Sequence, residues 1–184
     1  MDRLVEEVFV TEGVPQFTFV PPPNFNEILL DIRHPGKPVI IEGQSGTGKT
    51  TCVKKILEQL GSPEGIRYLT ARENADVSRI REIAIQRPSG IFVVDDFHRL
   101  EKELKEDLAN LAKLSAEQAS GVAALPKLVL IGINQVGSDL IQLVPDIAKR
   151  TGIHRIKSGT EEEIRKLVEA GCAESDTTRS AGGV

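Results

Sequence analysis

The sequence predicts an α/β domain in which helices cover both faces of a mainly parallel sheet. Short apolar runs alternate with patterns of helical spacing along most of the chain, as they do in proteins built from strand–helix–strand units. In addition, the glycine-rich segment GQSGTGKT at 43–50 directly follows the apolar run at 39–41. A loop of this kind, placed between a strand and a helix, is typical of parallel α/β proteins.

The glycine-rich segment matches the phosphate-binding pattern G-x-x-x-x-G-K-[ST]. Glycines allow the backbone to curl so that successive N–H groups point at phosphate oxygens. Lys49 is expected to reach the β- and γ-phosphates, and the Thr50 hydroxyl to occupy one position on Mg²⁺. The positive N-terminal end of the following helix faces the same site. An ordinary glycine turn is the alternative. We predict a nucleoside triphosphate site formed by Gly43, Gln44, Ser45, Gly46, Thr47, Gly48, Lys49, Thr50 and Thr51.

The apolar patterns define the order of the elements. Before the loop, Pro21–Pro23 and Asn24 mark the start of a helix over 25–32, and residues 17–20 alternate like a short edge strand. That edge segment is expected either to close over a flat base beside the phosphates or to pack in the ordinary way. After the loop, the pattern predicts helices at 53–60, 77–84, 100–111, 138–144 and 160–170, and strands at 66–70, 91–94, 127–133 and 153–157.

Two acidic residues follow the apolar strand at 91–94, where parallel sheets present side chains to ligands. Asp95 is expected to hold Mg²⁺ through its water shell, opposite Thr50. Asp96 is expected to orient the water that attacks the γ-phosphate, although Asp is one methylene shorter than Glu. A turn or helix-cap role is the alternative for both residues.

Three further polar residues are candidates for catalysis. Asn134 follows the strand expected to lie beside the loop strand, and its amide would then help to hold the attacking water; a turn role is the alternative. Arg150 precedes the fifth strand and is expected either to supply charge to a neighbouring subunit's phosphates or to be a surface arginine. Arg155 is a second candidate for the same role in trans. The candidate catalytic residues are therefore Asp96, Asn134 and Arg150.

Composition limits the classes of protein that fit. The chain has 184 residues, of which 40% are hydrophobic and 27% charged, as in a globular domain with a buried core. The net charge of −4 gives no general attraction to DNA. Cys52 and Cys172 have no metal or redox spacing. Because neither a secretory signal nor a membrane-spanning apolar run is evident, we expect a cytoplasmic protein without membrane contacts.

The order of four segments resembles the Walker A, Walker B, sensor 1 and arginine-finger stretches of AAA+ ATPases. The segments are 43–50, 91–96, 128–134 and 146–150, and the resemblance is nearest to Orc/Cdc6-like proteins, transposition regulators or bacterial defence ATPases. It implies a three-layer P-loop NTPase core at 38–158 with a five-stranded parallel sheet of order 5-1-4-3-2. It also implies that ATP and Mg²⁺ bind between subunits of a homo-oligomer.

The chain departs from the AAA+ pattern in two ways. Most of the family has Asp-Glu where this chain has Asp95-Asp96; Asp-Asp occurs in DnaA-type initiators and in STAND signalling ATPases. Outside the core, we expect an N-terminal segment and linker at 1–37 and a disordered tail at 172–184. The helical lid that follows the core in AAA+ proteins is reduced here to one helix, at 159–171. Both departures put efficient turnover by this chain alone in doubt.

Two main functions remain open at this stage. The first is an oligomerising Mg-ATPase that uses its nucleotide state to remodel or recruit an unknown protein partner. The second is a STAND-like signalling switch or scaffold with little hydrolysis. A metabolite kinase is a third class, but residues 110–126 lack the arginine-rich lid that such enzymes carry. DNA is a possible partner by family analogy only, without support from composition.

Overall fold

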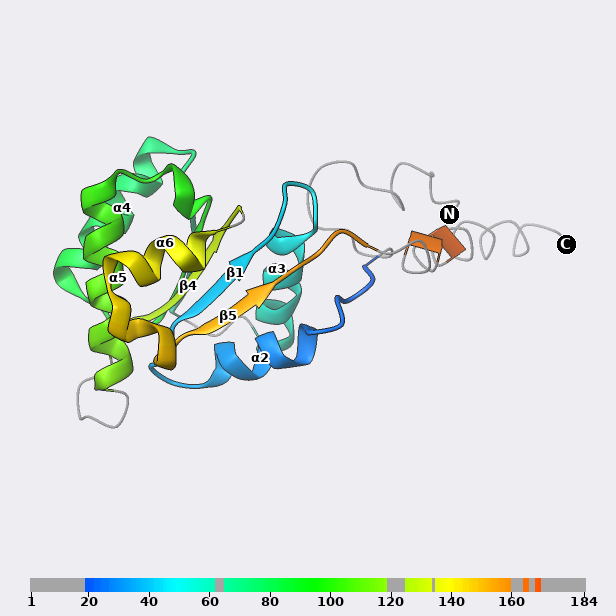
Figure 1. Ribbon diagram of the computed structural model, residues 1–184, viewed down its shortest axis with the longest axis horizontal. Helices are drawn as coiled ribbons and strands as arrows, with labels where there is room; N and C mark the ends of the chain where they lie inside the picture. Colours follow the sequence, from blue (N-terminus) through cyan, green and yellow to red (C-terminus); the bar gives the residue numbers. More distant parts are fainter. Residues whose placement is uncertain are drawn as a thin grey trace, which may run out of the picture.

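The computed structural model describes residues 19–61, 65–118, 125–133 and 135–159, together with Ile164, Arg165, Val168 and Glu169. Five parallel strands form a central sheet (Figure 1). The strands, in the spatial order β2-β3-β4-β1-β5, are β1 (Val39–Glu42), β2 (Ile66–Thr70), β3 (Ile91–Asp95), β4 (Lys127–Gly132) and β5 (Gly152–Arg155). This is the order 5-1-4-3-2 counted from the opposite edge, so the predicted fold class is confirmed.

The burial of each strand follows its place in the sheet. Every residue of β1 and of β4 is buried, because these neighbouring strands lie inside the sheet with both faces covered. The edge strand β5 alternates instead: Gly152 and His154 are buried, whereas Ile153 and Arg155 are exposed. The continuous apolar runs in the sequence therefore mark the centre of the sheet.

Helices cover the two faces of the sheet and complete three layers. Figure 1 shows α2 and α3 on one side of the sheet and α4, α5 and α6 on the other. Alternate residues of β1 face opposite layers: Val39 and Ile41 pack with α2 and α3, and Ile40 packs with the remaining helices. The helices are α2 (Phe25–Arg33), α3 (Lys49–Gln59), α4 (Asn74–Gln86), α5 (Lys102–Glu117) and α6 (Val136–Leu143), with short 3₁₀ helices η1 (Phe97–Arg99) and η2 (Pro145–Arg150).

The end of α2 is fixed to the sheet by a buried lysine. The Lys127 ammonium, at the start of β4, donates hydrogen bonds to the carbonyls of Asp31 (2.6 Å), His34 (2.8 Å) and Lys37. Burial lowers the pKa of Lys127 to about 7. Because these carbonyls belong to the last turn of α2 and the loop after it, the bonds satisfy acceptors that helix ends leave open.

The chain before α2 differs from the prediction. Phe19 and Val20 form no strand, and residues 17–18 lie outside the described part of the chain. Phe19 packs against Phe25 instead, with ring centroids 5.7 Å apart. The prolines that follow, Pro21–Pro23, lack the N–H groups that a paired strand needs. Ordinary packing, the alternative considered for this segment, is therefore what Phe19 adopts.

The expected lid helix and tail fall mostly outside the described residues. Within 159–171, the four described residues from Ile164 to Glu169 have helical backbone and are exposed, and residues 172–184 are not described. The boundaries proposed for the N-terminal segment, lid and tail therefore stay predictions. No helix in the described part of the chain is long and apolar enough to cross a membrane.

Candidate nucleotide-binding site

The glycine-rich loop joins β1 to α3 at the carboxyl edge of the sheet (Figure 1). Gly46 (φ 79°) and Gly48 (φ 81°) have left-handed backbone conformations, which strain any residue that carries a Cβ. Gly48 is also the N-cap of α3, so the loop leads directly into the positive end of that helix. Gly46 and Gly48 are thus required by the path of the backbone.

Lys49 lies against its own loop. Its ammonium donates hydrogen bonds to the carbonyls of Gly43 (3.0 Å) and Gln44 (2.7 Å). Burial lowers the pKa of Lys49, and the nearby carboxylates of Asp95 and Asp96 oppose that shift. The three side chains therefore belong to one electrostatic cluster.

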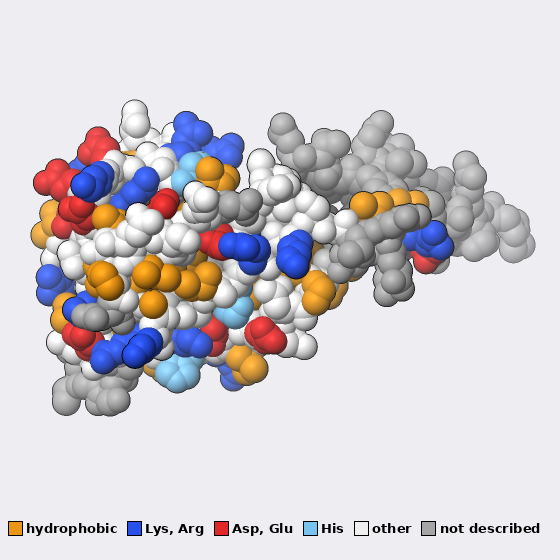
Figure 2. Space-filling view, in the orientation of Figure 1, with side chains coloured by type: hydrophobic (Ala, Val, Ile, Leu, Met, Phe, Trp, Pro, Cys, Tyr) orange, Lys and Arg blue, Asp and Glu red, His pale blue; other side chains and the backbone are white. Residues whose placement is uncertain are grey.

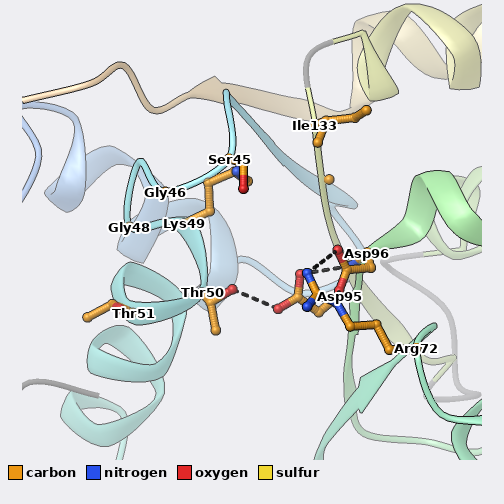
Figure 3. Close-up of a pocket in the computed structure, with 11 residues that line it drawn as sticks. Ser45, Gly46, Gly48, Lys49, Thr50, Thr51, Arg72, Asp95, Asp96 and Ile133 are labelled. Carbon is orange, nitrogen blue, oxygen red and sulfur yellow. Dashed lines mark hydrogen bonds and ion pairs between the residues drawn. The ribbon is translucent and has the colours of Figure 1, made fainter. Parts of the chain in front are cut away.

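Thr50 and Asp95 meet although they lie 45 positions apart in the sequence. The Thr50 hydroxyl donates a hydrogen bond to Asp95 Oδ2 at 2.7 Å, as Figure 3 shows. The other carboxylate oxygen, Oδ1, accepts the main-chain N–H of Asp96 at 2.7 Å. A hydroxyl and a carboxylate in contact are hard oxygen donors of the type that Mg²⁺ selects.

These donors fit an ion that keeps part of its water shell. In the described ranges no group of three or more His, Cys, Asp and Glu side chains comes together as a metal-binding cage. Magnesium in phosphate sites is commonly held by one or two protein oxygens, with water and phosphate supplying the rest. The Thr50–Asp95 pair offers that number of ligands.

Asp96 has a partner that the sequence did not predict. Arg72, in the loop after β2, donates from Nε to Asp96 Oδ2 at 2.5 Å and from its terminal nitrogen to Oδ1 at 3.3 Å. Asp96 itself has a left-handed backbone (φ 55°), which turns the chain out of β3 at this point. The carboxylate expected to orient water is thus held on both oxygens by an arginine.

Tyr68 is a second residue that the sequence did not predict. Its hydroxyl forms a hydrogen bond with Asp95 Oδ2, the oxygen that also accepts from Thr50. Burial is the main cause that raises the pKa of Tyr68, and the Asp95 carboxylate raises it further. Residues 66–70 suggest only a short strand, in which Tyr68 and Thr70 share a face; the contact with Asp95 depends on the pairing of β2 with β3.

Two cavities meet at the loop. A cavity of about 290 Å³ is lined by Lys49, Thr50, Arg72 and both aspartates, with Gly132 and Ile133 at the end of β4 (Figure 3). A more apolar cavity of about 610 Å³ adjoins it at Gly46, Gly48 and Thr51. Its walls come from residues 19–24 before α2, residues 155–159 at the end of β5 and after it, and Ile164. The combined space is in the range of small-molecule sites.

The remaining candidates lie in different places. Asn134 is outside the described residues, although Ile133 beside it lines the smaller cavity. Arg150 precedes β5, whose first residue pairs with the start of β1, so it lies at the edge of the sheet opposite the loop. Its guanidinium is half exposed and lies 3.7 Å from Glu117. Within one chain, the structure does not bring Arg150 to the loop.

Arg155 is engaged inside its own chain. Two of its nitrogens donate to Glu42 Oε1, at 3.1 and 2.6 Å, and the other Glu42 oxygen accepts the N–H of Gly137 at 3.1 Å. Glu42 is only 4% exposed. A buried carboxylate needs such a partner, because burying an unpaired charge is costly. Arg155 thus joins β5 to β1 and lines the larger cavity.

Comparison with solved structures identifies the fold. The chain is similar to the Orc1 protein of Aeropyrum pernix, solved in complex with DNA (TM-score 0.63, 16% identity, covering 94% of this chain and 54% of that one). It is also similar to Cdc6p from Pyrobaculum aerophilum (TM-score 0.62, 19% identity, 91% and 53%). The chain has the P-loop NTPase fold of these proteins. The RuvB Holliday junction branch migration motor of Thermotoga maritima shares this fold (TM-score 0.55, 18% identity, 94% and 55%).

The likeness concerns fold and not the whole of these proteins. The chain spans about half the length of the solved structures that it matches. No protein-family model and no curated protein sequence matches the chain.

Proposed function

We propose that the chain is a Mg²⁺-dependent ATP-binding and ATP-hydrolysing module that oligomerises on nucleotide and thereby remodels or recruits a partner protein. The observation that carries the proposal is the 2.7 Å contact between Thr50 and Asp95 at the mouth of the glycine-rich loop. It supplies a metal-binding pair next to backbone N–H groups suited to phosphate. The AAA+ fold supports the same assignment.

Each part of a nucleotide has a matching part of the site. The triphosphate would occupy the smaller cavity, with Lys49 exchanging its bonds to loop carbonyls for bonds to phosphate oxygens. The base and sugar would occupy the larger, more apolar cavity, against Phe19 and Ile156. When bound, Mg²⁺ neutralises charge on the phosphates. Thr50 and Asp95 would hold it there.

Hydrolysis requires Asp96 to face the attacking water. A carboxylate in this position orients the water and accepts its proton. Asp96 is only 15% exposed at its side chain and borders the smaller cavity, which supports this role. Asn134, at the end of the adjacent strand, is proposed to hold the same water.

The position of Arg150 supports the proposed oligomerisation. This arginine lies at the opposite edge of the sheet from its own loop and is half exposed, which supports a contact with another subunit. A guanidinium supplied in trans stabilises charge in the transition state of phosphoryl transfer. We therefore propose that ATP is bound between subunits. We also propose that the protein acts in the cytoplasm.

The Arg72–Asp96 ion pair favours a second candidate function. If Asp96 stays paired with Arg72 when nucleotide is bound, the water lacks its base and ATP persists. The module would then act as a nucleotide-held signalling switch or scaffold with little hydrolysis. DNA binding has less support, because Lys and Arg side chains are interspersed with Asp and Glu on the face drawn in Figure 2.

Calorimetric titration with ATP and Mg²⁺ tests the proposed site. We expect the wild-type chain to bind and the Lys49→Ala variant to lose most of its affinity. Lys55→Ala is the matched control, because Lys55 lies on the same helix but pairs with Glu58. Equal binding by wild type and Lys49→Ala would remove this loop from the proposal.

Light scattering tests oligomerisation separately. We expect the mass to increase when a non-hydrolysable ATP analogue and Mg²⁺ are added, and a constant monomer would favour the switch. Turnover then separates the two functions: hydrolysis that is lost in Asp96→Asn argues against the switch, and binding without turnover argues for it.

A further inference from the structure

The carboxylate of Asp95 is held by three donors. Oδ2 accepts the hydroxyls of Thr50 and Tyr68, and Oδ1 accepts the N–H of Asp96. A carboxylate held in this way has a fixed orientation, because rotation about its last bond would break hydrogen bonds on both oxygens.

We propose that Tyr68 is the positioning residue for metal binding: its hydroxyl holds Asp95 in the orientation that lets Asp95 and Thr50 share one Mg²⁺. This inference rests on the proposed function and adds a residue that the phosphate-loop motif does not contain. Groups that hydrogen-bond to a ligating carboxylate commonly tune metal affinity, although they do not touch the ion.

The place of Tyr68 in the fold makes its hydroxyl a rigid support. In β2 it pairs with Val93 of β3, and Thr70 pairs with Asp95, so Tyr68 and Asp95 project from the same face of the sheet. The ring packs with the apolar cluster under α2 and α3. Lys54 lies on α3, one turn after Thr50. Its Nζ is 5.0 Å from the centroid of the Tyr68 ring.

The phenol is suited to this role because it remains a donor. Its hydroxyl is the donor in the hydrogen bond to Asp95 Oδ2. A phenylalanine would keep the ring, the packing and the contact with Lys54, and would remove only the bond to Asp95. The substitution Tyr68→Phe therefore isolates the proposed contribution.

The test measures the Mg²⁺ concentration that nucleotide binding requires. A fluorescent ATP analogue is titrated with wild type and with Tyr68→Phe at a series of free Mg²⁺ concentrations and in EDTA. We expect the Mg²⁺ concentration at half-maximal enhancement to rise about 10- to 100-fold in Tyr68→Phe. The affinity in EDTA stays unchanged, because the loop and Lys49 are intact. An unshifted Mg²⁺ requirement would overturn the inference.

Two controls make the result specific. Lys54→Met keeps the Tyr68 hydroxyl and removes the cation over its ring, so its Mg²⁺ requirement should equal that of wild type; a shift equal to that of Tyr68→Phe would overturn the role of the hydroxyl. If wild type binds the analogue no better than Lys49→Ala does, the proposed function fails. Binding in wild type with no shift in Tyr68→Phe overturns the positioning role alone.

A spectroscopic measurement tests the hydrogen bond without nucleotide. The chain contains one tyrosine and no tryptophan, so its ultraviolet emission comes from Tyr68 alone. A phenol that donates to a carboxylate is quenched, because the excited phenol passes its proton to the acceptor. We expect stronger emission in folded Asp95→Asn than in wild type. Equal emission in the two proteins would contradict the Tyr68–Asp95 bond on which the inference rests.

Discussion

Arg72 and Asp96 form a two-point ion pair at the phosphate end of the site, with Nε and a terminal nitrogen directed at the two carboxylate oxygens. The arginine side chain is 66% exposed and the aspartate side chain 15% exposed. The expected catalytic carboxylate is therefore occupied by a partner that is itself largely in solvent. Such a pair is weak enough to open when a ligand competes for either side chain.

Removing that partner should increase hydrolysis. An ion pair with an exposed member is weak, so Arg72→Ala is expected to raise the steady-state rate of ATP hydrolysis by no more than about fivefold. Phosphate release at saturating ATP measures it. Arg81→Ala is the control, since Arg81 pairs with the exposed Glu101. A lower rate in Arg72→Ala would instead assign Arg72 to phosphate binding.

Asp96→Asn should separate binding from chemistry. Asn keeps the size of the side chain and loses its ability to accept a proton. We expect hydrolysis to fall at least about 100-fold, the usual contribution of a general base. The affinity for ATP, measured by calorimetry, should change little, because Asp96 is not expected to hold phosphate or metal. A variant that hydrolyses ATP at the wild-type rate would exclude Asp96 as the base.

The core beneath α3 should be sensitive to truncation. Ile56 is fully buried between the helix and the sheet. Ile56→Ala is expected to lower the free energy of unfolding by about 2–5 kcal/mol, because it removes buried apolar contacts and leaves a cavity. Ile85 is 73% exposed, so Ile85→Ala serves as the matched control with a change near zero. Urea denaturation measures the free energy of unfolding of both variants. Equal decreases in the two would contradict the packing described.

Cys52 should not react with thiol reagents in the folded protein. It is 1% exposed, and burial raises the pKa of its thiol to about 12. In a Cys172→Ser background, we expect an aromatic disulfide reagent at pH 8 to react with Cys52 only after denaturant is added. Rapid reaction without denaturant would show that α3 opens readily.

The same shift in the pKa of Cys52 has a defined effect on stability. The thiol binds its proton more tightly in the folded state than in the unfolded state, so unfolding releases a proton above about pH 9. The contribution is fully present below pH 9 and is lost as pH rises from 9 to about 12, with a slope of about 1.4 kcal/mol per pH unit. Urea denaturation of wild type and Cys52→Ala at pH 8 and 10 measures this difference in slope.

The elements that position the site were predictable because each has a local pattern. The wholly apolar runs in β1, β3 and β4 indicate buried strands, and the glycines of the loop indicate a turn with left-handed backbone. The expectation that Thr50 and Asp95 lie close together followed from placing both at the carboxyl edge of one sheet. Their 2.7 Å separation agrees with that expectation.

The partners of the two carboxylates were not predictable, because they depend on contacts between distant segments. Tyr68 reaches Asp95 only when β2 pairs with β3 in register, and Arg72 reaches Asp96 from a loop whose path has no sequence pattern. Arg155 shows the same limit. This residue was a candidate for action on another subunit, yet its guanidinium donates to Glu42 of its own chain.

Among the described residues, strand β2 is bonded to the sheet along one side only, through β3. Tyr68 lies within this strand, and Arg72 lies two residues beyond its end. Strands at a margin fray more easily than central ones, so a brief detachment of β2 would free Asp95 and Asp96 together. Lys49 and Thr50, which start the helix after the interior strand β1, would stay in place. The orientation of the two carboxylates thus depends on an edge strand that can separate from the sheet. The phosphate-binding loop depends instead on an interior strand.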